Sequence, residues 1–347
     1  MDQRLKLAIE AGHVALTRAE AETGRIALWG PGADTDLSFL DPDRVVVLQN
    51  FKPDAEAFEA RGFSVFPETT AAAQGMFEQS LVFLPRARGA LRDRVARASA
   101  QTQGPLIIDG LKTEGADSLY KALKPIAELG AAFSKSHGKT FEARFEQNSE
   151  GLEGWRGEMS EAVPGFQTYP GVFSADKIDR GSALLVEHLP QKLSGHWADF
   201  GAGWGFLSKA ICERGVAHVD CIEADHAALS CAQVNLEGAP AAFYWEDIRH
   251  FAPRASYDGI ISNPPFHVSR KSDARLGQAF IDAAAQALSP RGRFWMVANR
   301  HLPYEASLET CFAQWSEVAS ADGFKVFCAE RPRSKAPARV SVRRNAR

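Results

Sequence analysis

The chain has 347 residues, of which 45% are hydrophobic, and it carries 40 basic against 43 acidic side chains. This length and apolar content exclude a wholly disordered protein and predict about two domains. The net charge of −3 excludes a uniformly basic nucleic-acid-binding protein. The charge is uneven, however, because residues 331–347 contain seven basic groups and no acid. An acidic body therefore precedes a short basic tail.

Short apolar strands alternate with helical stretches along both halves of the sequence. In the first half, helices are predicted at 54–61 and 90–100, and strands at 25–29, 45–49, 63–66, 81–84 and 106–109. In the second half, strands are predicted at 197–200, 218–223, 241–245, 259–262 and 293–298. Strands separated by helices of about ten residues or more form parallel βαβ units. The sequence therefore predicts an α/β fold with doubly wound parallel sheets.

The two halves of the sequence resemble each other. In 81–110, LVFLPR is followed by a helix and GPLIIDG, while in 259–298 GIISNPPF is followed by a helix and GRFWMVA. This similarity favours an internal duplication, with a convergent α/β pattern as the alternative. The predicted domains are 1–147 and 169–330, joined by a polar, Gly-rich linker at 148–168 and followed by the basic tail 331–347.

The N-terminus and the cysteines indicate the compartment. The first residues, MDQRLKLAIEAGHVAL, lack the apolar core of a signal peptide. No stretch of the sequence approaches the roughly 18 apolar residues of a membrane span. The five cysteines form neither a CxxC pair nor a His/Cys cluster with metal-site spacing. We therefore expect a cytoplasmic protein with reduced thiols, no metal site and no membrane partner.

A glycine-rich loop follows the first strand of the second half. In WADFGAGWGFLS (197–208), the strand runs into Asp199, and Gly201, Gly203 and Gly205 lead into a helix. Glycines let the backbone turn tightly and approach a ligand, and a helix N-terminus offers unpaired N–H groups. Dinucleotide-binding proteins have a similar loop. The acid in D-x-G-x-G-x-G stands where their pattern usually has an apolar residue or glycine.

Acidic residues end the next two strands of the second half. Glu223 lies 18 positions after Gly205, where a carboxylate can accept hydrogen bonds from both hydroxyls of a ribose. Asp247 ends the third strand, where it could accept a hydrogen bond from an adenine amino group. The alternatives are that Asp199 caps the loop, Glu223 is an exposed turn acid and Asp247 is the N-cap of 248–251. Three acids at successive strand ends beside a glycine-rich loop favour an adenosyl ligand.

The fourth strand of the second half ends in an Asn-Pro-Pro-Phe turn at 263–266. The two prolines remove two N–H donors and stiffen the turn. The carbonyls of Asn263 and Pro264, with the side-chain oxygen of Asn263, can then accept hydrogen bonds from an amino group. Phe266 offers a flat face on which a planar base can stack. A plain structural loop with a core phenylalanine is the alternative.

These motifs together resemble class I S-adenosylmethionine-dependent methyltransferases that act on amino nitrogens. PGVFSADKIDRGSALLVEHL, DFGAGWGFLS, SNPPFH, VANRHLPYE and FKVF, all within 170–327, are similar to the ribosomal RNA small subunit methyltransferase C family. The resemblance implies two tandem Rossmann-like class I methyltransferase domains. The N-terminal one would be degenerate, since it has WGPGAD and LVFLPR where the second half has its glycine and NPPF motifs. It would serve substrate recognition or stability.

The resemblance also implies a binding site for S-adenosylmethionine. Glu223 would bind the ribose hydroxyls and Asp247 the adenine. Phe173 and Ser174, in GVFS, would close the pocket from the preceding segment. The other cofactor-binding residues lie in the glycine-rich loop and the NPPF turn: Asp199, Gly201, Ala202, Gly203 and Asn263.

The reaction implied by the resemblance is methylation of guanine N2 in ribosomal RNA. The catalytic residues would be those of the turn: Asn263, Pro264, Pro265 and Phe266. Asn263 and Pro264 would accept hydrogen bonds from N2, and Phe266 would stack on the base. The methyl group transfers in one in-line displacement, so positioning contributes most of the catalysis. The partner would be ribosomal RNA or a ribosomal subunit. The basic side chains of segments 267–275 and 331–347 could contact its phosphates. The enzyme is expected to be a monomer.

Three other functions are compatible with parts of the sequence. A large-subunit guanine-N2 methyltransferase shares the same motifs. A protein glutamine N5 methyltransferase typically has NPPY and a helical accessory domain, so Phe266 and the α/β first half argue against it. A cofactor-binding RNA-binding or assembly protein without activity is disfavoured by the intact motifs. Pyrimidine C5 methylation needs a nucleophilic cysteine, typically in a Pro-Cys turn, and the chain has no Pro-Cys pair.

Overall fold

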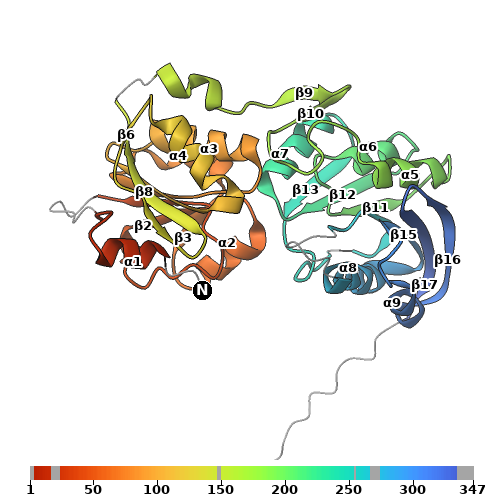
Figure 1. Cartoon of the computed structure of the whole chain (residues 1–347). Helices are drawn as coiled ribbons and strands as arrows, with labels where there is room; N and C mark the ends of the chain where they lie inside the picture. The colour runs from red at the N-terminus through yellow and green to blue at the C-terminus, as the bar shows by residue number, and fades with distance from the viewer. Residues whose placement is uncertain (1–3, 17–23, 147–149, 254, 266–273, 334–347) are drawn as a thin grey trace, which may run out of the picture. The chain divides into compact units, whose positions relative to one another are not determined.

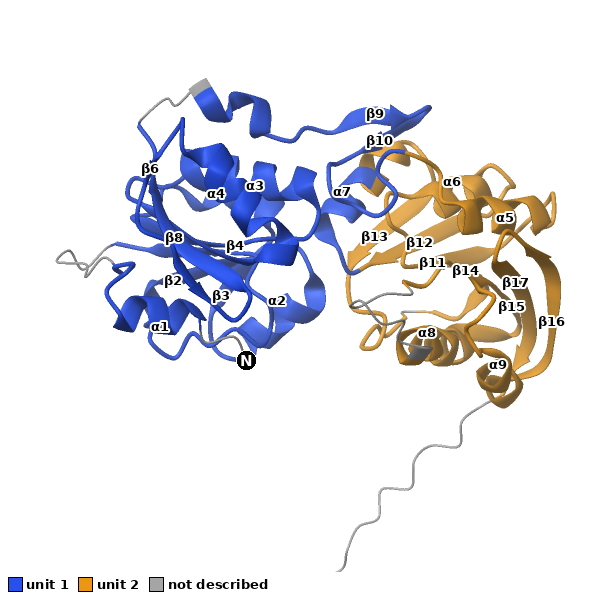
Figure 2. Ribbon diagram, viewed as in Figure 1, with its two compact units in different colours: residues 1–176, 224–231 blue, residues 177–223, 232–347 orange. Residues whose placement is uncertain are grey.

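The computed structural model describes residues 4–16, 24–146, 150–253, 255–265 and 274–333 (Figure 1). The chain divides into two compact units. Unit 1 comprises 1–176 and 224–231, and unit 2 comprises 177–223 and 232–347 (Figure 2). The first boundary between the units thus falls after Asp176, and the segment predicted as a linker, 148–168, belongs to unit 1.

Unit 1 is built on an eight-stranded sheet with the main order β3-β2-β1-β4-β5-β8-β6, and β7 also pairs with β8. Its strands are β1 (Ile26–Trp29), β2 (Val45–Leu48), β3 (Ser64–Phe66), β4 (Gln79–Phe83), β5 (Leu106–Leu111), β6 (Glu128–Leu129), β7 (Phe133–Lys135) and β8 (Gly138–Arg144). The first five are parallel, and β8 runs antiparallel to β5, β6 and β7. The five strands predicted for the first half are therefore all present.

Helices cover both faces of the unit 1 sheet. The helices of unit 1 are α1 (Arg4–Glu10), α2 (Lys52–Glu59), α3 (Arg88–Ala100) and α4 (Ala116–Leu123), with short 3-10 helices η1 (Pro42–Arg44), η2 (Glu68–Gln74) and η3 (Lys112–Glu114). Figure 1 shows α1 and α2 on one face of this sheet and α3 and α4 on the other. Alternate residues of one strand face different cores, so that Leu28 packs with α1 and α2 while Trp29 packs with α3 and α4. A sheet covered on both faces gives the nearly continuous apolar strands from which the fold was predicted.

The last part of unit 1 is not a plain linker. After Glu150 the chain forms η4 (Glu150–Trp155) and a two-stranded antiparallel sheet of β9 (Ser160–Val163) and β10 (Phe166–Thr168). The segment is tied to α3, because the hydroxyl of Tyr169 donates to Asp93 at 2.7 Å and the N–H of Gly157 donates to the same carboxylate at 2.8 Å. These contacts join residues far apart in the sequence, so they could not be predicted from the polar composition of the segment.

Unit 2 is built on a seven-stranded sheet with the order β13-β12-β11-β14-β15-β17-β16. The strands are β11 (His196–Phe200), β12 (His218–Glu223), β13 (Ala241–Trp245), β14 (Tyr257–Ser262), β15 (Leu288–Asn299), β16 (Phe312–Ala321) and β17 (Phe324–Pro332). The helices are α5 (Arg180–His188), α6 (Phe206–Cys212), α8 (Ala274–Ala287) and α9 (Glu305–Cys311), while α7 (His226–Asn235) is shared between the units. Figure 1 shows α5 and α6 on one face of this sheet and α8 and α9 on the other.

The two sheets have the same strand order. In each sheet, the first five strands of the unit are parallel and lie in the order third, second, first, fourth, fifth. The next strand in the sheet, β8 in unit 1 and β17 in unit 2, pairs antiparallel with the fifth. This confirms the predicted α/β fold with two tandem Rossmann-like domains. The strand order reverses between β1 and β4 in unit 1 and between β11 and β14 in unit 2. Open α/β sheets bind their ligands at the carboxyl ends of the strands at this switch point.

The cysteines and the lengths of the helices are two further features of the fold. All five cysteines are free thiols. Burial raises the pKa of Cys212 and of Cys328 to about 11, with smaller contributions from neighbouring acids, so neither is an activated nucleophile. Along the part of the chain that the structure describes, every helix is too short or too polar to cross a membrane.

Candidate active site

The glycine-rich loop after β11 turns sharply at the switch point of unit 2. Gly201, Gly203 and Gly205 have φ angles of 77°, 56° and 90°, in the left-handed region that favours glycine. The N–H groups of Gly201 and Ala202 both donate to the carbonyl of Ile222 in β12, at 2.9 and 3.1 Å. The loop is therefore held against the carboxyl end of the neighbouring strand.

Asp199 lies at the end of β11 and is fully buried. Its Oδ2 accepts a hydrogen bond from the hydroxyl of Ser208 in α6 at 2.7 Å, whereas its Oδ1 is buried and makes no hydrogen bond. Burial raises the pKa of Asp199 to about 7, and the negative charge of Glu223 adds to the shift, although the Ser208 hydroxyl opposes it. A ligand that brings a positive charge or an N–H donor to Oδ1 would stabilise the ionised carboxylate.

Glu223 is the last residue of β12 and is half-buried. Its Oε2 accepts a hydrogen bond from the N–H of Gly203 at 2.7 Å. The carboxylate predicted to bind a ribose is therefore joined directly to the loop predicted to hold the rest of the ligand. This contact disagrees with the alternative of an exposed turn acid.

Asp247 lies just beyond β13 and is buried. Its carboxylate accepts hydrogen bonds from the backbone N–H of Arg249 at 2.9 Å and from the guanidinium Nε at 2.8 Å. Burial alone would raise the pKa of Asp247, but these hydrogen bonds and the positive charge of Arg249 outweigh it and hold the pKa below its ordinary value. The side chain thus stabilises the turn over 248–251, as the capping alternative expected. Its contact with adenine stays a prediction.

Asn263 follows β14 directly, and its side chain is held in one orientation. Its Nδ2 donates to Oδ2 of Asp179 at 2.9 Å and to the hydroxyl of Ser182 at 2.8 Å. Because only the amide nitrogen can donate to a carboxylate, the contact with Asp179 fixes which way the amide points. The Oδ1 of Asn263 is then buried and makes no hydrogen bond with any other described residue. The site therefore presents a second buried acceptor without a partner.

Asp179 and Ser182 were not identified from the sequence. Asp179 is the N-cap of α5, and its Oδ2 also accepts a hydrogen bond from the N–H of Ser182 at 2.9 Å. Asp followed by a helical stretch indicates such a cap. Its second role, toward a side chain 84 positions away, depends on packing that no local pattern reveals.

The remaining predicted residues fall into two groups. Pro264 is buried and Pro265 exposed in the turn after β14, whereas Phe266 and 267–273 lie outside the described residues. Phe173 and Ser174 belong to unit 1, where Phe173 is 65% exposed and Ser174 has a φ of 53°. The roles predicted for these side chains stay predictions.

The corresponding edge of unit 1 is filled by an ion pair. The guanidinium of Arg94 in α3 donates to both carboxylate oxygens of Glu68, at 2.6 and 2.7 Å, and to the carbonyl of Phe83. It also lies over the turn after β1, since a Cβ added to Gly30 would be 2.3 Å from the guanidinium. By strand order, Gln49 of unit 1 corresponds to Glu223 of unit 2. Its amide nitrogen donates to the carbonyl of Pro31, in the turn after β1, at 2.7 Å.

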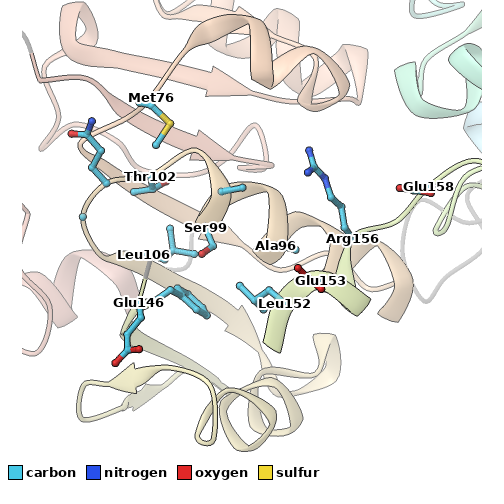
Figure 3. Close-up of a pocket in the computed structure, with 14 residues that line it drawn as sticks. Met76, Ala96, Ser99, Thr102, Leu106, Glu146, Leu152, Glu153, Arg156 and Glu158 are labelled. Atoms are coloured by element: carbon cyan, nitrogen blue, oxygen red, sulfur yellow. The ribbon is translucent and has the colours of Figure 1, made fainter. Parts of the chain in front are cut away.

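A cavity of about 920 Å³ in unit 1 is not the counterpart of the active site (Figure 3). Ser99 at the end of α3 and Gly104 and Leu106 at the start of β5 line it, together with Leu152 of η4. It therefore lies at the amino end of β5, whereas ligands of this fold bind at the carboxyl ends.

Comparisons with known proteins agree with this geometry. The methyltransferase small domain family matches residues 164–328, which include the glycine-rich loop and the NPP turn. The ribosomal RNA small subunit methyltransferase C of Pseudomonas syringae pv. syringae (strain B728a) is 31% identical over 331 residues, covering 92% of this chain and 98% of that protein. The protein of the same name from Shewanella piezotolerans is 29% identical, covering 78% of this chain and 82% of its own length.

A solved structure matches along most of the chain. The T. thermophilus 16S rRNA N2 G1207 methyltransferase, in complex with AdoMet and guanosine, aligns with a TM-score of 0.76 and 27% identity, covering 90% of each chain. The similarity to this relative, in sequence and in fold, therefore covers both units and not a single domain. With 31% identity along 98% of a relative, the chain belongs to the ribosomal RNA small subunit methyltransferase C family.

Proposed function

We propose that this protein transfers the methyl group of S-adenosylmethionine to the exocyclic N2 of a guanosine in 16S ribosomal RNA. The observation that carries the proposal is the side chain of Asn263. Asp179 and Ser182 hold its nitrogen, so its Oδ1 is a buried acceptor without a partner at the end of β14. A fixed acceptor of this kind fits an amino group. Membership of the family and the guanosine in the T. thermophilus relative's structure support the same substrate.

The residues at the switch point fit S-adenosylmethionine. That molecule carries an ammonium group, a sulfonium and ribose hydroxyls, which are positive charges and hydrogen-bond donors. Asp199 offers an unpartnered buried oxygen, and Glu223 offers a carboxylate at the glycine-rich loop. When bound, the cofactor supplies an activated methyl group. The acceptors of this chain would fix the position of that group relative to β14.

Asn263 would orient the nucleophile. Its Oδ1 accepts a hydrogen bond from the N2 amino group, which directs the nitrogen lone pair away from that bond and toward the methyl group. The rigid Asp179 contact keeps the acceptor in place, so little motion is needed during the reaction. A strong base is not required, because the proton leaves after the nitrogen has become positively charged. Phe266 would stack on the guanine.

The biological setting forms part of the same proposal. The enzyme would act as a monomer in the cytoplasm, with a small ribosomal subunit or its RNA as the partner. Unit 1 would contribute RNA recognition or stability rather than cofactor binding, because the Arg94–Glu68 ion pair occupies the edge where a cofactor would lie.

Labelled methyl transfer tests the proposal. The protein is incubated with methyl-labelled S-adenosylmethionine and, in parallel, small subunits, large subunits, naked 16S RNA and a release factor. We expect label in 16S RNA, recovered as N2-methylguanosine by mass spectrometry. Label in large-subunit RNA or in the release factor would reassign the substrate. Absence of transfer to all four would favour a non-catalytic assembly protein.

A further inference from the structure

Two histidines and an aspartate meet at the amino edge of the unit 2 sheet. His196 is the first residue of β11 and His218 the first of β12, and the register pairs these two residues directly. Asp220 lies two residues further along β12, so its side chain is on the same face as that of His218. Glu223 and the candidate active site are at the opposite ends of these strands. The cluster is therefore separate from the methyl-transfer site.

The distance from each histidine to the carboxylate matches that between two ligands of a tetrahedral metal ion. The Nε2 atoms of His196 and His218 lie 3.3 and 3.2 Å from the same oxygen, Oδ1 of Asp220. All three potential ligand atoms lie within 4.8 Å of one another. A tetrahedral zinc ion with ligands at about 2.0–2.1 Å keeps those ligands about 3.3–3.4 Å apart.

Hydrogen bonding does not account for the approach of His196 to the carboxylate. Its Nε2 is buried and makes no hydrogen bond, despite its distance of 3.3 Å from Asp220. The two imidazole rings meet edge to face, with centroids 5.1 Å apart and an angle of 64° between their planes. A buried nitrogen that lies close to a carboxylate, but off the line of a hydrogen bond, is what a shared cation would satisfy.

The carboxylate is oriented by a further contact. The hydroxyl of Tyr257 donates to Oδ2 of Asp220 at 2.7 Å, and Tyr257 is fully buried. This hydrogen bond occupies one oxygen and turns the other toward the histidines. Hydrogen bonds of this kind orient the ligands of metal sites and are common around them.

We propose that His196, His218 and Asp220 bind a divalent transition-metal ion, with zinc as the expected ion. Two imidazoles and one carboxylate suit zinc, whereas magnesium and calcium prefer oxygen ligands alone. The histidine side chains are 33% and 40% exposed, so the cluster lies at the surface of unit 2. The bound ion would join the starts of β11 and β12. These ligands share no short motif, so the sequence alone predicted no metal site.

Zinc titration of the full-length, untagged protein tests the site. After treatment with a chelator, the protein competes for Zn²⁺ with a chromogenic zinc indicator. We expect one ion per chain, with a dissociation constant in the micromolar range or below. Adding Mg²⁺ should leave the titration unchanged, and Co²⁺ should give the visible absorption bands of a tetrahedral complex.

Variants locate the ion. His196→Ala and His218→Ala should each weaken Zn²⁺ binding at least tenfold, and the double variant should lose it. His188→Ala, which removes an exposed histidine at the end of α5, is the matched control and should bind as the wild type does. Circular dichroism without metal checks that each variant is folded. The proposal is overturned if the wild type binds no Zn²⁺, or if the double variant binds it equally well.

Discussion

Two side-chain oxygens at the carboxyl edge of the unit 2 sheet are buried and have no hydrogen-bond partner within the described ranges: Oδ1 of Asp199 and Oδ1 of Asn263. An unsatisfied buried acceptor costs about 1–3 kcal/mol. Folded proteins leave few such atoms, and those that remain often mark functional sites. The two lie on adjacent strands, β11 and the end of β14, which are the strands on either side of the switch point. A ligand rich in donors would remove this cost on binding.

Asp199→Asn should stabilise the ligand-free protein at pH 8 and weaken cofactor binding. Burial raises the pKa of Asp199 to about 7 in the folded protein. Its value in the unfolded chain is about 3.9. The folded state therefore binds more protons between these values, and it loses stability as the pH rises through about 7. Asparagine carries no charge, so the melting temperature at pH 8 should rise by several degrees, about 2–4 °C for each kcal/mol.

Calorimetry at several pH values checks this prediction. The stabilisation should shrink as the pH falls from about 7 toward about 4, because the wild-type carboxyl group then approaches the same protonation in both states. The affinity for S-adenosylmethionine should fall at least tenfold in the variant. A stabilisation equal at pH 8 and pH 5, together with unchanged affinity, would contradict the electrostatic account.

Asn263→Ala should reduce kcat about 100-fold or more, the cost of removing one oriented polar group at a reacting centre. The dissociation constant for S-adenosylmethionine should change little, since Asn263 acts mainly on the nucleophile. Single-turnover methyl transfer at saturating cofactor measures the first quantity and calorimetry the second. A kcat near that of the wild type would show that the turn does not orient N2.

Asp179→Asn separates capping from orientation. Asparagine caps a helix about as well as aspartate, so α5 and the melting temperature should be preserved. The carboxylate that dictates the orientation of the Asn263 amide is lost, however, and we expect kcat to fall about tenfold while KM for RNA is unchanged. A fall in melting temperature with unchanged kcat would instead indicate that Asp179 has only the capping role.

At the scale of secondary-structure elements, the parallel strands could be predicted from sequence and the antiparallel ones could not. The inner parallel strands β1, β2, β11 and β14 are buried along most of their length, which gives short apolar runs. β16 is mostly exposed and polar, and β6 and β7 have only two and three residues, so none shows a periodic pattern. The same reasoning applies to the site. The motif acids and Asn263 could be identified locally, whereas Asp179 and Ser182 could not.

Arg94→Met should destabilise unit 1. The Arg94 and Glu68 side chains are only 13% and 8% exposed, so removing the arginine leaves a nearly buried carboxylate without its counter-ion. Breaking a buried pair in this way costs about 3–5 kcal/mol, and partial solvent access places the expected loss near the lower figure. Urea unfolding measures it. The double variant Arg94→Met/Glu68→Leu should recover much of the loss, and one S-adenosylmethionine should still bind per chain.

At the scale of the whole molecule, charge is distributed unevenly along the chain. The net charge of −3 averages an acidic body and a basic C-terminus. The structure shows that this C-terminal segment is not all tail, because β17 extends to Pro332 and the N–H of Arg333 donates to the carbonyl of Cys311 at 2.8 Å. Residues 331–333 of the segment predicted as a tail therefore belong to unit 2, and 334–347 lie beyond the described residues.

Deleting 334–347 should weaken RNA binding without altering the reaction. The deletion removes five basic residues and leaves β17 intact. Contacts with phosphates release counterions, so KM for the RNA substrate should rise and its dependence on salt concentration should become shallower. Initial rates at several salt concentrations measure both, and kcat should be unchanged. If KM at every salt concentration equals that of the full-length protein, the tail does not contact RNA.

The ion pair over Gly30 also bears on the history of the two halves. To bind a ligand at this edge, unit 1 would have to lose both Arg94 and Glu68, yet losing either one first leaves a charge without its counter-ion in a nearly buried environment. Each single-substitution intermediate would be less stable than the starting and final sequences. We therefore expect the two positions to be epistatic, and selection against unstable intermediates would make it difficult for unit 1 to acquire a ligand site at this edge.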